Sequence, residues 1–228
     1  PDLSIEEEKG AKPAAKPAAP ASAKGGGDGW ITLFDGSKLD AWTMGPDESW
    51  AVEDGVIALK REFDGKEHNT DYLWTRHPYG DFILEFEFMV PERANSGVFL
   101  RTADLENPVF TGIEVQVSNS FGRNPPTRGG TLGAIYDCQA PTENAAKPPG
   151  QWQRMRVTCD GPKITVEVNG DLVNEMDLDQ WTEPHQNPDG SKNKFGTALK
   201  DFARKGYIGF QDHGRPVWYR NVRLKPLN

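Results

Sequence analysis

Apolar residues recur at every second position along much of the chain from Trp30 onward, which is the pattern of half-buried β-strands. Residues 82–90 show it most clearly, because large apolar side chains alternate there with Glu85 and Glu87. The same alternation is found in residues 97–101, 112–117, 152–159 and 163–168. The pattern predicts about a dozen strands and no long amphipathic helix, with a short helical turn expected only at residues 197–204.

Turn signals separate these predicted strands. Asn169-Gly170 is a two-residue hairpin signal, since both residues tolerate the positive φ angles of a type I′ turn, and residues 53–56 suggest a second hairpin. So many strands with alternating faces need two packed sheets or a closed barrel. The sequence therefore predicts an all-β fold, a two-sheet antiparallel β-sandwich of jelly-roll type. Two long segments without strand character, 118–130 and 179–205, are expected to frame a site.

The chain divides into a polar leader and one domain. Residues 1–28 are rich in Lys, Ala and Pro and end in glycines, so they cannot bury enough apolar surface to fold, and we expect a disordered tether. Residues 29–228 are expected to form a single β-sandwich domain. Because the chain opens at Pro1, we expect that an upstream segment has been removed, and such a spacer is typical of an exported or lipid-anchored protein.

Composition and charge exclude several classes of partner. The net charge is −8, and because the first 27 residues carry equal numbers of acids and lysines, all of it belongs to the domain. An acidic domain with a pI near 5.1 argues against nucleic-acid binding. The mean hydropathy is −0.68 and no apolar run is long enough for a membrane span. Cys138 and Cys159 form no metal motif, and Cys159 fits a buried strand position.

Polar residues on two predicted strands are candidates for a shared face. If Val115 points into the sandwich, Glu114 and Gln116 point out, and on a neighbouring strand Phe99 and Arg101 do the same. A carboxylate, a carboxamide and a guanidinium suit a sugar, because planar groups bind hydroxyl pairs well. The alternative is a solvated outer face carrying surface ion pairs.

The segment Gly209-Phe-Gln-Asp-His-Gly214 is the sharpest local motif. Its alternation places Gln211 and His213 on the outer face, and a histidine there is a natural proton carrier. The alternative is a structural turn in which Asp212 binds backbone amides. His68, His77 and His185 lie in loop-like contexts and are not candidates.

Other acidic and aromatic residues give weaker signals. Glu85 and Glu87 resemble an acid/base pair on one strand face, but the spacing fits neither glycosidase geometry, and we expect exposed strand acids. Two interpretations are left for Trp74, Trp181 and Trp218: they stack on sugar rings, or they belong to the core. The chain has no nucleophile-elbow, P-loop or zinc-protease motif.

Ten short motifs together resemble the 3-keto-disaccharide hydrolase domain family. They occupy residues 30–42, 50–56, 79–82, 94–101, 112–116, 133–136, 147–152, 168–170, 206–214 and 218–222, in that order. The resemblance implies a concanavalin A-like jelly roll, common in exported proteins and lipoproteins of bacteria, with activity toward oxidised sugars. Periplasmic or cell-surface localisation and a carbohydrate substrate are therefore expected. The laminarinase-type Glu-x-Asp-x-Glu strand is absent, which argues against ordinary retaining hydrolysis.

A mechanism for 3-keto sugars assigns roles to residues within these motifs. A ketone at C3 acidifies the hydrogen at C2, so a base can start an elimination that water addition completes. The hypothesis is that His213 or Glu114 removes the proton while Arg101 and Lys147 stabilise the enolate. The expected substrate-binding residues are Gln116, Tyr136, Gln211, Asp212, Trp218 and Arg220.

A divalent metal is an alternative source of positive charge, with Glu114, Asp212 and His213 as its ligands, although no ligand spacing supports it; no other cofactor is expected. Three rival functions stay open: a carbohydrate-binding module, a conventional glycoside hydrolase using Glu85, Glu87 or Glu114, and a structural surface domain.

Overall fold

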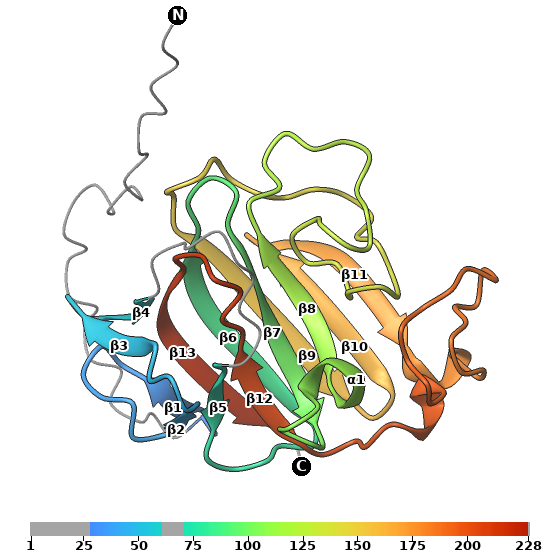
Figure 1. Ribbon diagram of the computed structural model, residues 1–228, viewed down its shortest axis with the longest axis horizontal. Coiled ribbons are helices and arrows are strands. Elements are labelled where there is room, and N and C mark those ends of the chain that lie inside the picture. Colours follow the sequence, from blue (N-terminus) through green and yellow to red (C-terminus); the bar gives the residue numbers. More distant parts are fainter. Residues whose placement is uncertain (1–27, 61–70, 228) are drawn as a thin grey trace, which may run out of the picture.

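The computed structural model describes residues 28–60 and 71–227 (Figure 1). These residues form two antiparallel sheets packed face to face, which confirms the predicted all-β sandwich. The predicted tether lies outside the described residues. The tether and the export that we inferred from it therefore stay predictions. In the described part of the chain, no helix has the length and apolar character needed to cross a membrane.

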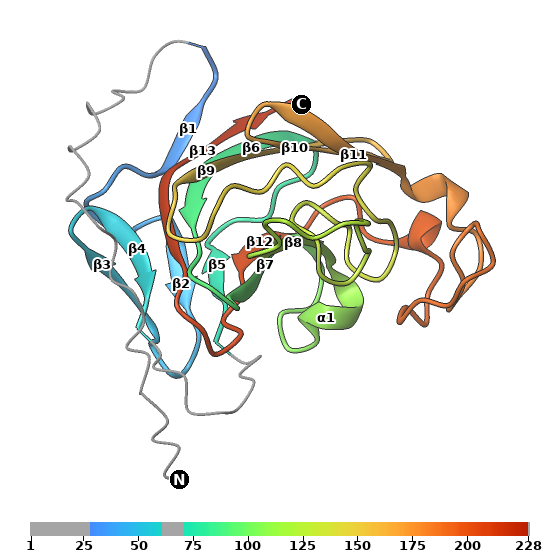
Figure 2. The same ribbon diagram turned by 90° about the horizontal axis from the view of Figure 1, so that it is seen from above.

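The larger sheet is curved and forms one layer of the sandwich (Figure 2). Its strands in spatial order are β11 (Asp171–Asp177), β10 (Lys163–Val168), β9 (Gln153–Asp160), β6 (Phe82–Met89), β13 (Trp218–Pro226), β4 (Val56–Leu59) and β3 (Trp50–Glu53). Strand β1 (Ile31–Phe34) also pairs with β13. The hairpin predicted at Asn169-Gly170 joins β10 to β11, with Asn169 at φ +56°.

The smaller sheet lies on the concave side of the larger one (Figure 2). Its spatial order is β2 (Trp42–Met44), β5 (Leu73–Thr75), β12 (Tyr207–Phe210), β7 (Asn95–Thr102) and β8 (Ile113–Ser118). One face of this sheet packs against the larger sheet, and the other face is available for a site.

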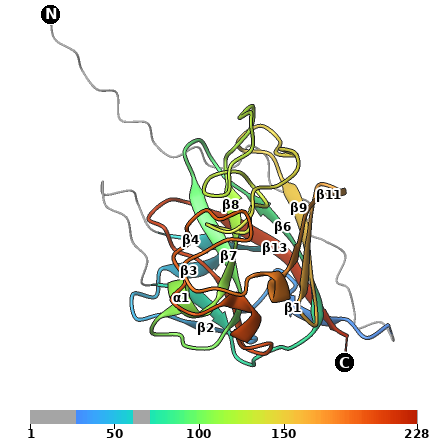
Figure 3. The ribbon, with the colours of Figure 1, turned by 90° about the vertical axis from the view of Figure 1, so that its right-hand side faces the viewer.

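Helical structure is short and lies in the connections. Helix α1 spans Pro108–Thr111, and the 3₁₀ helices η1 and η2 span Leu178–Gln180 and Leu199–Asp201. Helix η2 fulfils the prediction of a short turn at residues 197–204. The long connections that we predicted follow β8 and β11, and Figure 3 looks onto the side where both lie.

Aromatic side chains from both sheets form the core. Phe210 of β12 stacks on Tyr219 of β13 with ring centroids 3.9 Å apart, and Phe86 of β6 packs edge-on against Phe210 at 5.4 Å. Cys159 is fully buried, as its strand position predicted, and burial raises the pKa of its thiol to about 12. Removing this apolar surface from water is the main favourable term that holds the two sheets together.

The outer face of the larger sheet carries a cluster of arginines around Glu85. Arg156 Nε and Arg223 Nε donate to the two carboxylate oxygens at 2.7 and 2.8 Å, and Arg154 lies 2.8 Å away. The prediction that Glu85 is an exposed acid is wrong, because these guanidinium groups leave its side chain 4% exposed. Glu87 is partly exposed and pairs with a single arginine at 2.6 Å.

Replacing Glu85→Ala should lower the free energy of unfolding by about 1–3 kcal/mol, because the arginines lose their charge-assisted hydrogen bonds. Glu87→Ala should cost less, at about 0.2–1 kcal/mol for one partly exposed pair. Burial opposes ionisation of Glu85, but the hydrogen bonds from its arginines outweigh burial and lower its pKa.

The stability that Glu85 contributes is therefore present above its ordinary pKa of 4.5 and is lost as the pH falls through its lower folded value. Urea unfolding of both variants at several pH values measures this. An equal loss in the two variants, or a Glu85 effect that grows on acidification, would contradict the assignment.

Candidate functional site

A cluster of aromatic rings covers part of the outer face of the smaller sheet. Tyr72, next to β5, stacks on Trp74 at 4.9 Å, and Phe99 of β7 meets Tyr72 edge-on at 5.1 Å. This cluster is separate from the core between the sheets. Gly209 lies opposite Trp74 in the neighbouring strand, and a Cβ atom there would collide with the indole ring. The glycine therefore allows the tryptophan to lie across the sheet.

Glu114 lies beside this aromatic cluster, on β8, where it is paired in register with Phe99. The period-two prediction for Glu114 and Gln116 agrees with the structure, since Gln116 also lies on this outer face, opposite Gly97. A Cβ atom on Gly97 would come within 2.6 Å of Glu114 Oε1. The absence of a side chain at this position lets the carboxylate lie over β7.

Lys194 supplies the positive charge next to Glu114. Its Nζ atom lies 3.7 Å from Glu114 Oε2 and 4.7 Å from the centre of the Tyr136 ring. Lys194 comes from the connection between β11 and β12, far from Glu114 in the sequence. We did not predict it, because a single lysine in a long loop carries no periodic signal and no motif.

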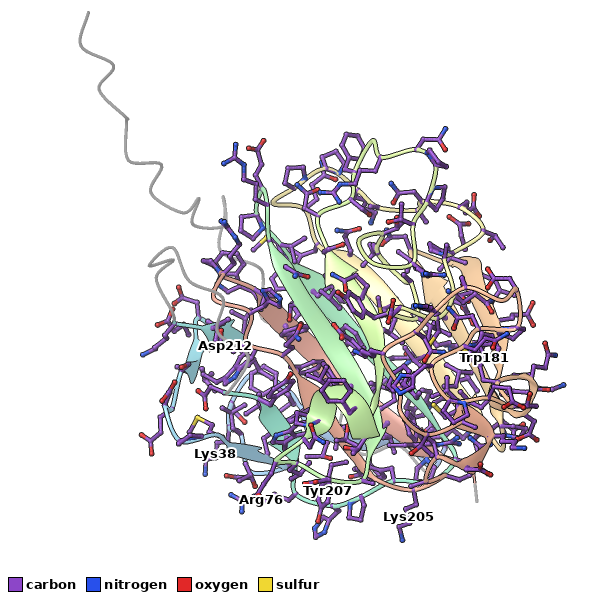
Figure 4. All side chains as sticks on the ribbon, turned by 45° about the vertical axis from the view of Figure 1, so that its right-hand side comes forward. Lys38, Arg76, Trp181, Lys205, Tyr207 and Asp212 are labelled. Atoms are coloured by element: carbon purple, nitrogen blue, oxygen red, sulfur yellow. The ribbon has the colours of Figure 1, made fainter. Side chains whose placement is uncertain are left out.

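Buried hydrogen bonds hold this loop in place. Asn187 accepts a bond from Trp181 Nε1 at 2.8 Å and donates to the Asp137 carbonyl at 3.1 Å. Nearer Lys194, the His185 amide donates to the Phe195 carbonyl at 2.7 Å. In Figure 4, Trp181 and Asp212 lie on opposite flanks of the β7–β8 pair, so the loops that carry them border the site from two sides.

Burial perturbs both charged groups of the pair. It raises the pKa of the Glu114 carboxyl to about 7, against the opposing effect of the Lys194 charge. It lowers the pKa of the Lys194 ammonium, against the opposing effect of Glu114. A carboxyl that titrates near neutral pH can accept and return a proton under physiological conditions.

Several buried polar atoms around Glu114 make no hydrogen bond of normal geometry with the described residues. They are Tyr72 Oη, Gln116 Oε1, Lys194 Nζ and Gln211 Oε1. Gln116 and Gln211 are only 2% and 4% exposed, so water does not satisfy them freely. Buried polar groups in native proteins are almost always paired, and an unpaired set indicates a ligand site. These atoms suit a ligand that carries several hydroxyl groups.

Four of the predicted substrate-binding residues lie around this pair. The Tyr136 amide donates to the Glu114 carbonyl at 2.9 Å, and the Gln211 amide donates to the Gly97 carbonyl at 3.0 Å. Gln116 donates to Asn95 Oδ1 at 2.5 Å. Asp212 is buried and accepts the Gly214 amide at 2.8 Å, as the structural-turn alternative predicted, and its charge also acts on the nearby Tyr72 hydroxyl.

Arg101 does not share the Glu114 face, which corrects the prediction. Its backbone has φ +50° at a register shift between β7 and β12, so the alternation breaks there. The guanidinium donates to the Gly80 and Gly161 carbonyls and to Asp81, at 2.7–2.8 Å. With its side chain 2% exposed and these donors occupied, Arg101 links β7 to the segment before β6 and to the turn between β9 and β10, and it does not serve the site.

Three further predicted residues lie elsewhere. Lys147 is exposed, and its Nζ donates to the Trp152 carbonyl at 3.3 Å rather than approaching Glu114. Trp218 and Arg220 are on β13, and Arg220 pairs with Glu87 on the outer face of the larger sheet. Both residues were expected at the site because they lie in a motif of the family resemblance, and a motif match does not say on which of the two sheets a residue lies.

His213 lies half-buried in the turn after β12, one residue beyond Asp212, and it makes no hydrogen bond or ion pair with the described part of the chain. Among residues 28–60 and 71–227, no three His, Cys, Asp or Glu side chains converge to hold a metal ion. The ligand set of Glu114, Asp212 and His213 is therefore not formed by these residues.

Comparisons with known proteins find relatives named for activity on carbohydrates and structures with the same β-sandwich fold. A 3-keto-disaccharide hydrolase of Bacteroides thetaiotaomicron is 29% identical over 231 residues, which covers 88% of this chain and 79% of that protein. A crystal structure from Parabacteroides distasonis, provisionally described as a glycosyl hydrolase, is 30% identical with a TM-score of 0.76. It covers 87% of this chain and 99% of its own.

A second structure from Parabacteroides distasonis, with the same provisional description, is 24% identical with a TM-score of 0.66 and supports the fold. It covers 88% of this chain and 94% of its own. The fold and these relatives together indicate a carbohydrate-active β-sandwich protein. The family model described as a 3-keto-alpha-glucoside-1,2-lyase-like domain matches residues 29–225. The chain belongs to this family, as the resemblance of its motifs predicted.

The Glu114 carboxyl should titrate with a midpoint of about 7, because burial disfavours its charged form. Carbon-13 NMR of the glutamate side chains across pH 4–9 measures it, and Glu114→Gln identifies the resonance by its loss. A midpoint at the ordinary value of 4.5 would contradict the prediction, because burial would then not outweigh the effect of the Lys194 charge.

Proposed function

We propose that the protein cleaves 3-keto-glycosides, including 3-keto-disaccharides, by elimination followed by hydration, with Glu114 as the base. The observation that carries the proposal is the buried Glu114 carboxyl, whose pKa is raised to about 7, among the unpaired oxygens of Gln116 and Gln211. The family to which the chain belongs and the printed activity of its Bacteroides relative support the choice of substrate.

The chemistry begins at C2 of the oxidised sugar. The C3 ketone acidifies the C2–H bond, so Glu114 takes the proton and the electron pair moves into an enolate on the C3 oxygen. The enolate then forms the C1=C2 bond and expels the glycosidic oxygen. Water then adds at C1 while the proton returns from Glu114 to C2. The proton that the water loses balances the one that the departing oxygen takes up, so the net reaction is hydrolysis. No oxocarbenium ion and no second carboxylate nucleophile are needed.

A base with a pKa near the working pH is effective, because about half of it is deprotonated and the deprotonated form still accepts the proton readily. A conventional retaining hydrolase instead needs two carboxylates about 5–5.5 Å apart across the bond. Glu85 and Glu87, the pair that would serve such a mechanism, are bound to arginines on the other sheet. Elimination from a 3-keto sugar therefore fits the arrangement better.

The groups around Glu114 are suited to holding a sugar ring. The unpaired carboxamide oxygens of Gln116 and Gln211 can accept hydrogen bonds from sugar hydroxyls. The Tyr72 hydroxyl stays protonated at neutral pH, because burial raises its pKa, so it can donate to an oxygen of the ligand. Bonds to groups that are otherwise unsatisfied favour a ligand with hydroxyls in the matching positions.

Glu114→Gln should lower kcat/KM for a 3-keto-disaccharide by at least about 10²-fold, because the amide cannot accept the C2 proton. For the wild type, kcat/KM should rise with pH to a plateau around a midpoint of about 7, as the carboxylate forms. The matched control is Glu87→Gln, on the outer face of the other sheet, which should leave turnover unchanged. Chromatography of the released sugars measures both.

The same assay with the matched unoxidised disaccharide separates the rival functions. Under the proposal it is not cleaved. Equal release from both disaccharides would indicate a conventional glycoside hydrolase and contradict the proposal. Saturable binding without any product, measured by calorimetry, would indicate a binding module and contradict it as well.

We further propose that His213 protonates the departing glycosidic oxygen. His213→Gln should then slow cleavage of a 3-keto-disaccharide more than cleavage of 4-nitrophenyl 3-keto-glucoside, because nitrophenolate leaves without a proton. His77→Gln, at an exposed position, is the control. Equal losses on the two substrates would remove His213 from this role.

A further inference from the structure

The enolate that forms in the proposed reaction needs a positive group at its oxygen, and Arg101 and Lys147 are engaged elsewhere. Lys194 is the cation that the fold brings to Glu114. Its side chain is 15% exposed, and its Nζ lies 3.7 Å from Glu114 Oε2. The aromatic rings of Tyr136 and Phe195 lie within 4.7 and 5.2 Å of the same atom.

The Lys194 contacts differ from those of a structural ion pair. In the cluster around Glu85, Arg223 and Arg156 donate to the carboxylate at 2.6–2.8 Å. Lys194 Nζ is buried, lies 3.7 Å from Glu114 Oε2, and makes no hydrogen bond of normal length with the described residues. Burying an ammonium without such bonds costs free energy, so its donors are available to a ligand.

The spacing of the two charged groups matches what the reaction requires. In a 3-keto sugar, the C2 hydrogen and the C3 oxygen are on adjacent carbons, so the base and the cation have to be neighbours without being hydrogen-bonded to each other. A separation of 3.7 Å between Glu114 Oε2 and Lys194 Nζ meets this condition. In a site that excludes water, a fixed positive charge stabilises a developing oxyanion strongly.

We infer that Lys194 is a catalytic residue that donates a hydrogen bond to the C3 oxygen and stabilises the enolate as Glu114 removes the C2 proton. The inference rests on the proposed function. It moves the role that the sequence assigned to Arg101 and Lys147 onto a residue of the β11–β12 connection. Lys194 stays protonated throughout, and no bond forms between its nitrogen and the sugar.

The test compares Lys194→Met with Lys192→Met, an exposed lysine two residues away on the same loop. Lys194→Met should lower kcat for a 3-keto-disaccharide by about 10²–10³-fold with little change in KM, the loss typical of removing one oxyanion donor. Exchange of the C2 hydrogen with deuterated water should fall by a similar factor. Lys192→Met should match the wild type, and Lys194→Arg should recover part of the activity.

A pH profile separates this role from a merely structural one. Lys194 lowers the pKa of Glu114, so its replacement by Met should move the acid limb of kcat/KM to a pH above 7. Lys194→Gln is a second variant, with circular dichroism to establish that it is folded.

If the folded variants Lys194→Met and Lys194→Gln exchange the C2 hydrogen at the wild-type rate and have the wild-type kcat, the inference is overturned and the proposed function still stands. A Lys194 adduct trapped by borohydride would also overturn it, because the nitrogen would then bond to C3. A wild-type protein that neither exchanges the C2 hydrogen nor releases product would overturn both the inference and the proposed function.

Discussion

The stacking of Phe210 on Tyr219 is the contact on which the rest of the structure depends, because it fixes the smaller sheet against the larger one. Tyr219 also bonds through its hydroxyl to Ser96 at 2.9 Å, and Ser96 donates to the Gln211 carbonyl at 2.7 Å. This buried network joins β13, β7 and the residue after β12. Once Phe210 faces inward, Gly209 and Gln211 have to face the site.

The two faces of the sandwich use charge in different ways. On the larger sheet, arginines saturate Glu85 and lower its pKa, so the cluster contributes to stability. On the smaller sheet, Glu114 is buried beside Lys194, which makes no hydrogen bond of normal length with the described residues, and the pKa of Glu114 is raised. The second arrangement costs free energy in the absence of a ligand, as is common where a site is prepared for chemistry.

Much of the fold and part of the site could be predicted from alternation. The outward faces of Glu114 and Gln116 follow from a regular strand, where each residue reverses direction. Arg101 departs from its predicted face because a positive φ and a register shift interrupt that regularity. Arg220 lies on the other sheet, because the motif that suggested it gives a place in the sequence and not a place in the sandwich.

The sequence by itself determined the two-sheet architecture, the family and the residues of β8 that face the site, because local periodicity and short motifs record these properties directly. The tertiary structure alone decided which cation meets Glu114. Lys194 is 80 residues away in the chain and is held by the buried bonds of Asn187 and its neighbours. A contact between distant loops depends on how the sheets pack, and no local pattern records that packing.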